Sequence, residues 1–188
     1  MKQFDKTELM EKTVSSRSVF RGHLLDIYED TVLLPNGQTA GREYNRHVGA
    51  VCVIPITAEG NVIMERQYRY PTGEVLLEIP AGKLNEKNED RTEAIRRELR
   101  EETGAVAGTL VDLGWFYPTP AYSDEKITMY LAKDLSYGDR SLDEDEFLNV
   151  EEIPLSELVK SALSGELHDA KTQMAVLRAY LYEKGEGR

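Results

Sequence analysis

The sequence has little cysteine and no long apolar run. One cysteine, Cys52, stands in 188 residues. A single thiol cannot form an intramolecular disulfide, and sparse cysteine is typical of proteins in a reducing compartment. No apolar run approaches the ~20 residues that span a bilayer, and residues 1–12 lack the apolar stretch of a signal peptide. These absences predict a cytoplasmic protein without a membrane partner.

Positive charge is also scarce. Against 34 Asp and Glu the chain carries 23 Lys and Arg, which gives a net charge of −11 and an isoelectric point near 4.8. Such a surface repels nucleic acids and anionic lipids, so we expect neither as a partner. If the ligand is a phosphate-bearing small molecule, bound metal ions or a local arginine cluster must offset this charge.

The hydrophobic pattern predicts strands and three helices that do not alternate. An apolar run at 48–57 is typical of a strand buried on both faces, and the turn at 35–38 predicts a hairpin inside an antiparallel block, 13–46. Further strands are expected at 62–70, 75–79, 106–116, 126–132 and 147–153, and helices at 90–103, 154–164 and 170–183. This order favours an α+β fold with a mixed central sheet, preceded by a small N-terminal antiparallel sheet that ends near His47.

The expected helix at 90–103 places three glutamates on one face. At about 100° per residue, Glu98, Glu101 and Glu102 fall within one sector of the helix, and two apolar residues lie beside them. Like charges this close repel each other, and a hard divalent cation bound by carboxylate oxygens removes that repulsion. The alternative is a solvated acidic face whose charge is balanced by arginines of the same helix.

The spacing around this helix resembles the Nudix box of the Nudix hydrolase superfamily. That box reads Gly-x5-Glu-x7-Arg-Glu-U-x-Glu-Glu-x-Gly-U, where U is bulky and apolar. The chain reads Gly82-x6-Glu89-x7-Arg97-Glu98-Leu99-x-Glu101-Glu102-x-Gly104. Two positions depart from the pattern, since six residues rather than five precede Glu89 and the last position is the small Ala105. The longer loop leaves open whether Glu89 or Asn88 takes the first glutamate position.

Stretches outside the box resemble one subfamily, the ADP-ribose pyrophosphatases. The loop at 116–125, Phe-Tyr-Pro-Thr-Pro-Ala-Tyr-Ser-Asp-Glu, is similar to a Phe-Tyr-x-Ser/Thr-Pro-Gly-Phe/Tyr-Ser-Asp-Glu loop of that subfamily, with Ala121 in place of glycine. The other similar stretches are 33–37 with Arg42-Glu43, 67–69, 78–84, 142–147 and 169–172. The resemblance therefore extends over residues 14 to 182.

The resemblance implies a fold, an assembly and a reaction. A Nudix α/β/α sandwich would occupy 48–188, and residues 1–47 would form a dimerising sheet that crosses to a second subunit, so the protein would be a homodimer. The implied cofactor is Mg²⁺ or Mn²⁺, with two or three ions per site. The implied reaction is hydrolysis of the diphosphate bond of ADP-ribose to AMP and ribose 5-phosphate.

The resemblance also implies metal ligands and a base. The ligands would be the backbone carbonyl of Ala81 and the carboxylates of Glu98 and Glu102, with Glu101 sharing a second ion. Arg97 would pair with a carboxylate of the box and hold the helix and its loop together. The base, or a further metal ligand, would come from the acidic loop as either Glu144 or Glu146.

Substrate contacts are implied in the same way. Arg69, together with Arg42 or Arg46, would meet the diphosphate or the terminal ribose. Phe20 would stack on adenine, and Pro120 belongs to the loop that favours ADP-ribose. From the residues alone, the arginines are equally consistent with surface ion pairs, Phe20 with the core of its small sheet, and the acidic run 143–146 with a solvated loop.

Two further functions are consistent with the sequence. One is a Nudix pyrophosphatase for another nucleoside diphosphate sugar, for example a GDP-sugar. The other is a non-catalytic module that binds a nucleotide sugar. Such a module is expected to have lost glutamates of the box, whereas Glu98, Glu101 and Glu102 are all present.

Overall fold

The computed structural model describes residues 7–142 and 146–186. Contacts between Cα atoms divide the chain into two compact units. The first unit consists of Met1–His47 with Thr119–Glu125, and the second of Val48–Pro118 with Lys126–Arg188.

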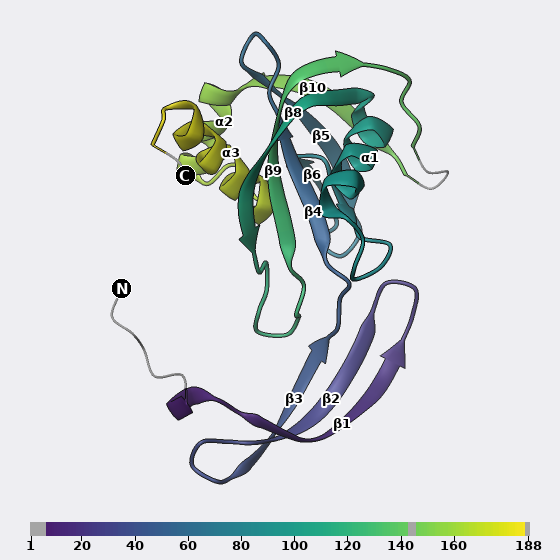
Figure 1. Cartoon of the computed structure of the whole chain (residues 1–188), viewed down its shortest axis with the longest axis vertical. Helices are drawn as coiled ribbons and strands as arrows, with labels where there is room; N and C mark the ends of the chain where they lie inside the picture. The colour runs from purple at the N-terminus through teal and green to yellow at the C-terminus, as the bar shows by residue number, and fades with distance from the viewer. Residues whose placement is uncertain (1–6, 143–145, 187–188) are drawn as a thin grey trace. The chain divides into compact units, whose positions relative to one another are not determined.

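The first unit is an antiparallel sheet in the order β1-β2-β3 (Figure 1). A short 3₁₀ helix, η1 (Thr7–Leu9), precedes β1 (Lys12–Arg21), β2 (Asp26–Leu33) and β3 (Thr39–Asn45). Every residue of β1 is exposed, whereas β2 buries Asp30 and Val32. The segment 119–125 joins this unit because Asn45 N–H donates to Tyr122 O over 2.8 Å.

Two sheets form the frame of the second unit. The four-stranded sheet has the order β7 (Ala81–Lys83), β4 (Ala50–Pro55), β9 (Ile127–Tyr137) and β8 (Ala105–Phe116). The three-stranded sheet has the order β10 (Leu148–Pro154), β5 (Asn61–Arg69) and β6 (Glu74–Glu78). β4 and β9 run parallel while β4 and β7 run antiparallel, so the larger sheet is mixed.

Helices cover the second unit from two sides. In Figure 1, α1 (Arg91–Thr103) lies on one side of the strands, and α2 (Leu155–Ser164) and α3 (Ala170–Glu183) lie on the other. Alternate residues of β4 serve the two sides: Val51 and Val53 join the apolar cluster under α1, while Cys52 and Ile54 join the cluster under α2 and α3. All six residues of β4 are buried, as its continuous apolar run predicts.

The predicted α+β class with a mixed sheet is confirmed, and so are the three helices. Two strands differ from the sequence prediction. The segment at 80–82 has turn residues but forms β7, because Ala81 pairs with Cys52 of β4. β9 continues past residue 132 to Tyr137, because Tyr137 pairs with Ala105 of β8. Within the described residues, no helix is both long and apolar enough to cross a membrane.

Candidate active site

Helix α1 is fixed at both ends by local signals in the sequence. The Asp90 carboxylate caps its start by accepting hydrogen bonds from Thr92 N (2.8 Å) and Glu93 N (3.0 Å). Gly104 ends it in the left-handed conformation with φ 76°, and its N–H donates to Arg100 O. With both ends set, the rotation of the helix about its axis follows from its apolar stripe, since Leu99 is fully buried.

This orientation gives Glu98, Glu101 and Glu102 graded burial. Glu102 is 5% exposed, while the side chains of Glu98 and Glu101 are 13% and 32% exposed. Glu102 Oε2 accepts a hydrogen bond from Ala81 N over 3.2 Å. Glu98 lies so close to Gly82 that a Cβ at residue 82 would overlap its carboxylate. Because glycine has no Cβ, it allows this close approach of the Glu98 side chain to the loop.

Arg97 connects the carboxylates of the helix to the preceding loop. Its Nη1 lies 2.8 Å from Glu98 Oε1 and 3.3 Å from Glu101 Oε2. Its Nη2 donates to Glu89 Oε1 over 3.4 Å, and Glu89 also accepts from the side chain of Asn85. Glu89 therefore holds the loop against the helix in spite of the additional residue before it. This is the pairing that the resemblance implies for Arg97.

Strand β5 supplies a carboxylate that the sequence did not single out. Glu65 is 3% exposed, and its Oε1 has no hydrogen-bond partner within the described residues. By strand alternation it shares a face with Ile63, which packs in the apolar cluster under α1, and with Gln67. Gln67 Nε2 lies 3.5 Å from Glu146 Oε1, which connects this face to the end of the acidic loop.

Burial, and then the crowding of carboxylates, raises the pKa values of these glutamates. Burial, followed by the charges of Glu65, Glu98 and Glu146, raises the pKa of Glu102. Burial, followed by the charge of Glu146, raises the pKa of Glu65 to about 8. Burial also raises the pKa of Glu98, although the neighbouring Arg97 opposes the shift. These groups therefore lie close enough to repel one another when ionised.

A second buried carboxylate, Glu78 on β6, lies in a cationic setting. Arg69 holds it with two hydrogen bonds of 2.7 Å, and Lys171 at the start of α3 forms an ion pair with its Oε2. Burial alone would raise the pKa of Glu78, but the hydrogen bonds from Arg69 and Lys171 outweigh it and lower the pKa. The Thr172 hydroxyl accepts from Ile79 N over 3.0 Å, so the start of α3 also fixes the backbone just before Ala81.

Two family models match the chain. The NUDIX domain matches residues 46–175, and the nucleoside diphosphate sugar hydrolase N-terminal domain matches residues 11–45. The chain belongs to the Nudix family. The helix α1 and the loop before it are thus the Nudix box, and the geometry described above is that of its glutamates.

Relatives of this Nudix protein align along almost its whole length. It is 43% identical over 177 residues to an ADP-ribose pyrophosphatase of Bacillus subtilis (strain 168), covering 93% of this chain and 95% of that protein. It is 43% identical to a methanol dehydrogenase activator of Bacillus methanolicus, covering 92% and 94%. A crystal structure of an ADP compounds hydrolase matches with a TM-score of 0.81 at 26% identity, covering 94% of this chain and 96% of that one.

The carboxylates of the Nudix box, together with Glu65 of β5, fit a hard divalent cation. Buried carboxylates that raise one another's pKa, with an unpartnered oxygen on Glu65, provide the oxygen ligands that Mg²⁺ and Mn²⁺ prefer. In residues 7–142 and 146–186, no three His, Cys, Asp or Glu side chains surround one metal position. Glu98 is engaged by Arg97, and Glu102 by Ala81 N–H.

The predicted substrate residues divide between the two units. Arg69 belongs to the second unit, where it is committed to Glu78. In the first unit, Arg42 pairs with Glu11, and the Arg46 guanidinium lies 3.7 Å from the centre of the Tyr28 ring. Phe20 and Pro120 also lie in the first unit, and both are exposed. Glu144, one of the two candidate bases, lies outside the described residues.

Sequence reasoning missed three residues that the structure brings to the site. Glu65 could have been identified from the sequence, because a glutamate at an inward position of a strand is unusual. Lys171 and Thr172 were noted only as part of a similar stretch. Their contacts reach Glu78 and Ile79 across 93 positions of the chain, and no local pattern reveals such a contact.

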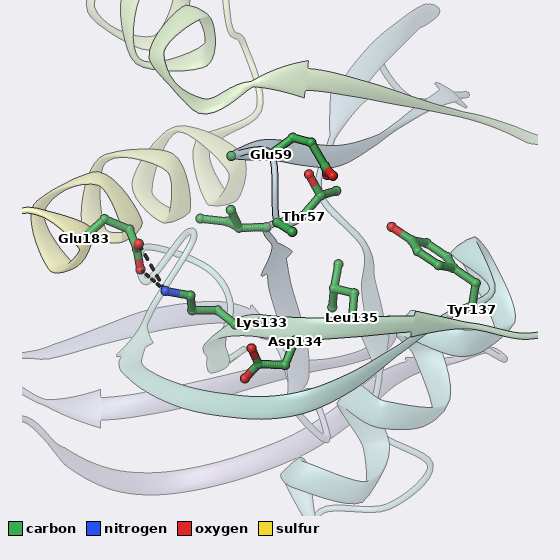
Figure 2. A pocket seen from close by; sticks show the side chains of 10 residues that line it. Thr57, Glu59, Lys133, Asp134, Leu135, Tyr137 and Glu183 are labelled. Carbon is green, nitrogen blue, oxygen red and sulfur yellow. Dashed lines mark hydrogen bonds and ion pairs between the residues drawn. The ribbon is translucent and has the colours of Figure 1, made fainter.

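A pocket of about 440 Å³ lies elsewhere in the second unit (Figure 2). Its lining includes Thr57, Glu59 and Tyr137, and none of the predicted site residues. Lys133 on its wall is already paired with Glu183 over 2.9 Å, as the dashed lines in Figure 2 mark. The remaining charged side chains of the lining are acidic, so the pocket does not suit a diphosphate.

Proposed function

We propose that this protein hydrolyses the diphosphate bond of ADP-ribose to AMP and ribose 5-phosphate. The proposal rests on two carboxylates of the Nudix helix that are largely buried, Glu98 and Glu102. Glu98 lies against Gly82, and Glu102 accepts a hydrogen bond from Ala81 N. Two relatives support the same substrate class, since one is named an ADP-ribose pyrophosphatase and the similar crystal structure is that of an ADP compounds hydrolase.

The proposed cofactor is Mg²⁺ or Mn²⁺, with two or three ions per site. The carbonyl of Ala81 and the carboxylates of Glu98 and Glu102 would hold it, with Glu101 sharing a second ion. When bound, such ions lower the pKa of a coordinated water and offset the charge of the phosphate oxygens. Arg97 contacts both Glu98 and Glu101, so it would help to position these carboxylates.

A carboxylate of the acidic loop is the proposed base. Glu146 is the candidate within the described residues, and its charge raises the pKa of Glu65, Glu98 and Glu102. That influence supports its proximity to the proposed metal ligands, where a base would have to lie. Glu144→Gln and Glu146→Gln separate the two candidates: the variant that lacks the base loses kcat and the acidic limb of its pH–rate profile, whereas the other keeps both.

The proposed substrate contacts are Phe20, Arg42, Arg46, Arg69 and Pro120. Arginine suits a diphosphate because its planar fork donates two parallel hydrogen bonds. Exposure of the Phe20 ring supports stacking on a base over a place in the core of its sheet. Phe20→Ala is expected to raise KM for ADP-ribose by about tenfold, since stacking of a base on an aromatic ring contributes about 1–3 kcal/mol.

We further propose that the protein is a homodimer whose subunits meet through the N-terminal sheet. β1 is an edge strand of that sheet, and it exposes Val14, Val19 and Phe20 along its length. Exposed edges and apolar strand faces are covered in most soluble proteins, and a second copy is the occupant we propose. Light scattering should give twice the 21.3 kDa mass of the chain, and a mass of 21.3 kDa would exclude the dimer.

The direct test of function is a substrate panel with Mg²⁺. ADP-ribose should release AMP faster than a GDP-sugar releases GMP. The match of residues 11–45 to a nucleoside diphosphate sugar hydrolase domain fits either substrate, whereas a relative named a GDP-mannose pyrophosphatase, 35% identical over 147 residues, supports the GDP-sugar as the alternative. Turnover of a GDP-sugar without turnover of ADP-ribose would show that the substrate is a GDP-sugar. Binding of either compound without turnover would support a non-catalytic module. We place the enzyme in the cytoplasm, as its single cysteine predicts, and cell fractionation tests this.

A further inference from the structure

We propose that Glu65 is an additional metal ligand, which shares a divalent cation with Glu102. The inference rests on the proposed metal-dependent function, and it adds a ligand from the three-stranded sheet to those of the Nudix box. Glu65 is not part of the box and precedes it in the sequence, on β5.

The first argument is the state of the Glu65 side chain. The residue is only 3% exposed, and its Oε1 lacks any hydrogen-bond partner within the described residues. A buried carboxylate oxygen without a partner is costly, and proteins retain one where a cation or a proton compensates it. The fold therefore keeps a group here that needs a partner from solution.

The second argument is the position of Glu65 on the sheet. β5 is the central strand, so Glu65 lies between Val150 of β10 and Glu78 of β6. Its side chain points to the face that α1 covers, two residues after Ile63 of the cluster under that helix. After burial, the charge of Glu65 contributes most to the raised pKa of Glu102, so the two carboxylates interact electrostatically.

The third argument is that the nearby cations are already engaged. Lys171 pairs with Glu78 and Asp169, and Arg69 pairs with Glu78. Arg140 acts on Glu65 only through its field, because its guanidinium donates to Leu148 O over 3.0 Å. None of these three forms an ion pair with Glu65 in the described part of the chain, so an external divalent cation is the partner that its chemistry fits.

The test measures metal binding without substrate. Mn²⁺ is titrated into the metal-free, full-length protein, and free Mn²⁺ is followed by electron paramagnetic resonance. Glu65→Gln keeps the shape and removes the charge, and it should weaken the tightest Mn²⁺ site by about tenfold or more. Glu151→Gln is the matched control, because it removes one charge from the neighbouring strand β10, where Glu151 pairs with Arg66. The control should bind Mn²⁺ like the wild type.

Thermal unfolding supplies a second readout. Without metal, Glu65→Gln should be at least as stable as the wild type, because the substitution removes a buried unpaired acid. With Mn²⁺ the wild type should gain more in Tm than the variant, since a ligand stabilises by its affinity for the folded state. Glu65→Met, which is similar in size and apolar, is expected to behave in the same way and replaces the first variant if that one does not fold.

The outcomes separate this inference from the proposed reaction. Unchanged Mn²⁺ affinity and an unchanged Tm gain in both Glu65 variants would overturn the inference and leave Glu65 as a buried neutral acid. Absence of Mn²⁺ binding by the wild type would overturn it as well. If the variants lose Mn²⁺ affinity but the wild type does not hydrolyse ADP-ribose, Glu65 is confirmed as a metal ligand and ADP-ribose is excluded as the substrate.

Discussion

Two buried glutamates lie side by side on neighbouring strands, but only one of them has cationic partners. Glu65 of β5 and Glu78 of β6 are register partners, and each is at most 3% exposed. Arg69 and Lys171 neutralise Glu78 and lower its pKa, whereas Glu65 lacks an ion pair within the described residues and its pKa is raised. Equal burial therefore does not give equal roles. The carboxylate with cations from the chain ties strands and helix α3 together, and the one without them is left for a cation from solution.

Substitution of Glu102, the buried neighbour of Glu65, should give the largest effect, and that effect should be a loss of activity. Glu102→Gln removes a proposed metal ligand while it also removes a buried charge that repels Glu65 and Glu98. The kcat for ADP-ribose should fall by about 100-fold or more, with Tm equal to or above that of the metal-free wild type. Steady-state kinetics and thermal unfolding check the two halves of this prediction.

The control is Glu93→Gln on the same helix, where the side chain is exposed. It changes the net charge of α1 by the same amount and should leave kcat within about twofold, since surface substitutions have small effects. Equal losses in both variants would mean that the total charge of the helix matters and the position of Glu102 does not.

Substitution on the partnered side should act on stability first. Lys171→Met leaves Glu78 with Arg69 alone, and breaking a buried ion pair costs about 3 kcal/mol in the free energy of unfolding. Lys133→Met is the control, because it breaks the more exposed pair with Glu183 and should cost below about 1 kcal/mol. Urea denaturation measures the free energy of unfolding of both variants. Similar losses in the two would mean that burial of the ion pair does not determine its contribution to stability.

Gly82→Ala tests the closeness of loop and helix. The added Cβ displaces the end of the Glu98 side chain, which is flexible, so the free energy of unfolding should change by less than about 1 kcal/mol while kcat falls by about tenfold. Gly138→Ala is the matched control in the same unit, because nothing lies within 4 Å of a Cβ there. An active Gly82→Ala enzyme would mean that the present position of Glu98 is not the one used in catalysis.

The smallest effect concerns pH in the metal-free protein. The pKa of Glu65 is raised in the folded state, so its contribution to stability is complete below about 4.3, the pKa of an unfolded glutamate, and is lost as pH rises through about 8. The pKa of Glu78 is lowered, so its contribution is lost as pH falls instead. Stability curves in a chelator should show the alkaline loss in the wild type and less of it in Glu65→Gln.

The sequence predicted what depends on neighbouring residues. Asp90 and Gly104 set the ends of α1, and helical spacing brought Glu98, Glu101 and Glu102 to one face, because these relations lie within one turn or one cap. It did not predict which distant group neutralises a buried carboxylate. The pairing of Glu78 with Lys171 and the lack of an ion pair at Glu65 depend on how sheets and helices pack, which strand alternation alone does not determine.

The most direct measurement is product analysis of ADP-ribose hydrolysis by the wild type and Glu102→Gln, each with Mg²⁺ and with a chelator. We predict equal amounts of AMP and ribose 5-phosphate from the wild type with Mg²⁺, and almost none in the chelator or from the variant. Turnover by Glu102→Gln at the wild-type rate, or turnover in the chelator, would contradict the assignment of these carboxylates to a metal-dependent site.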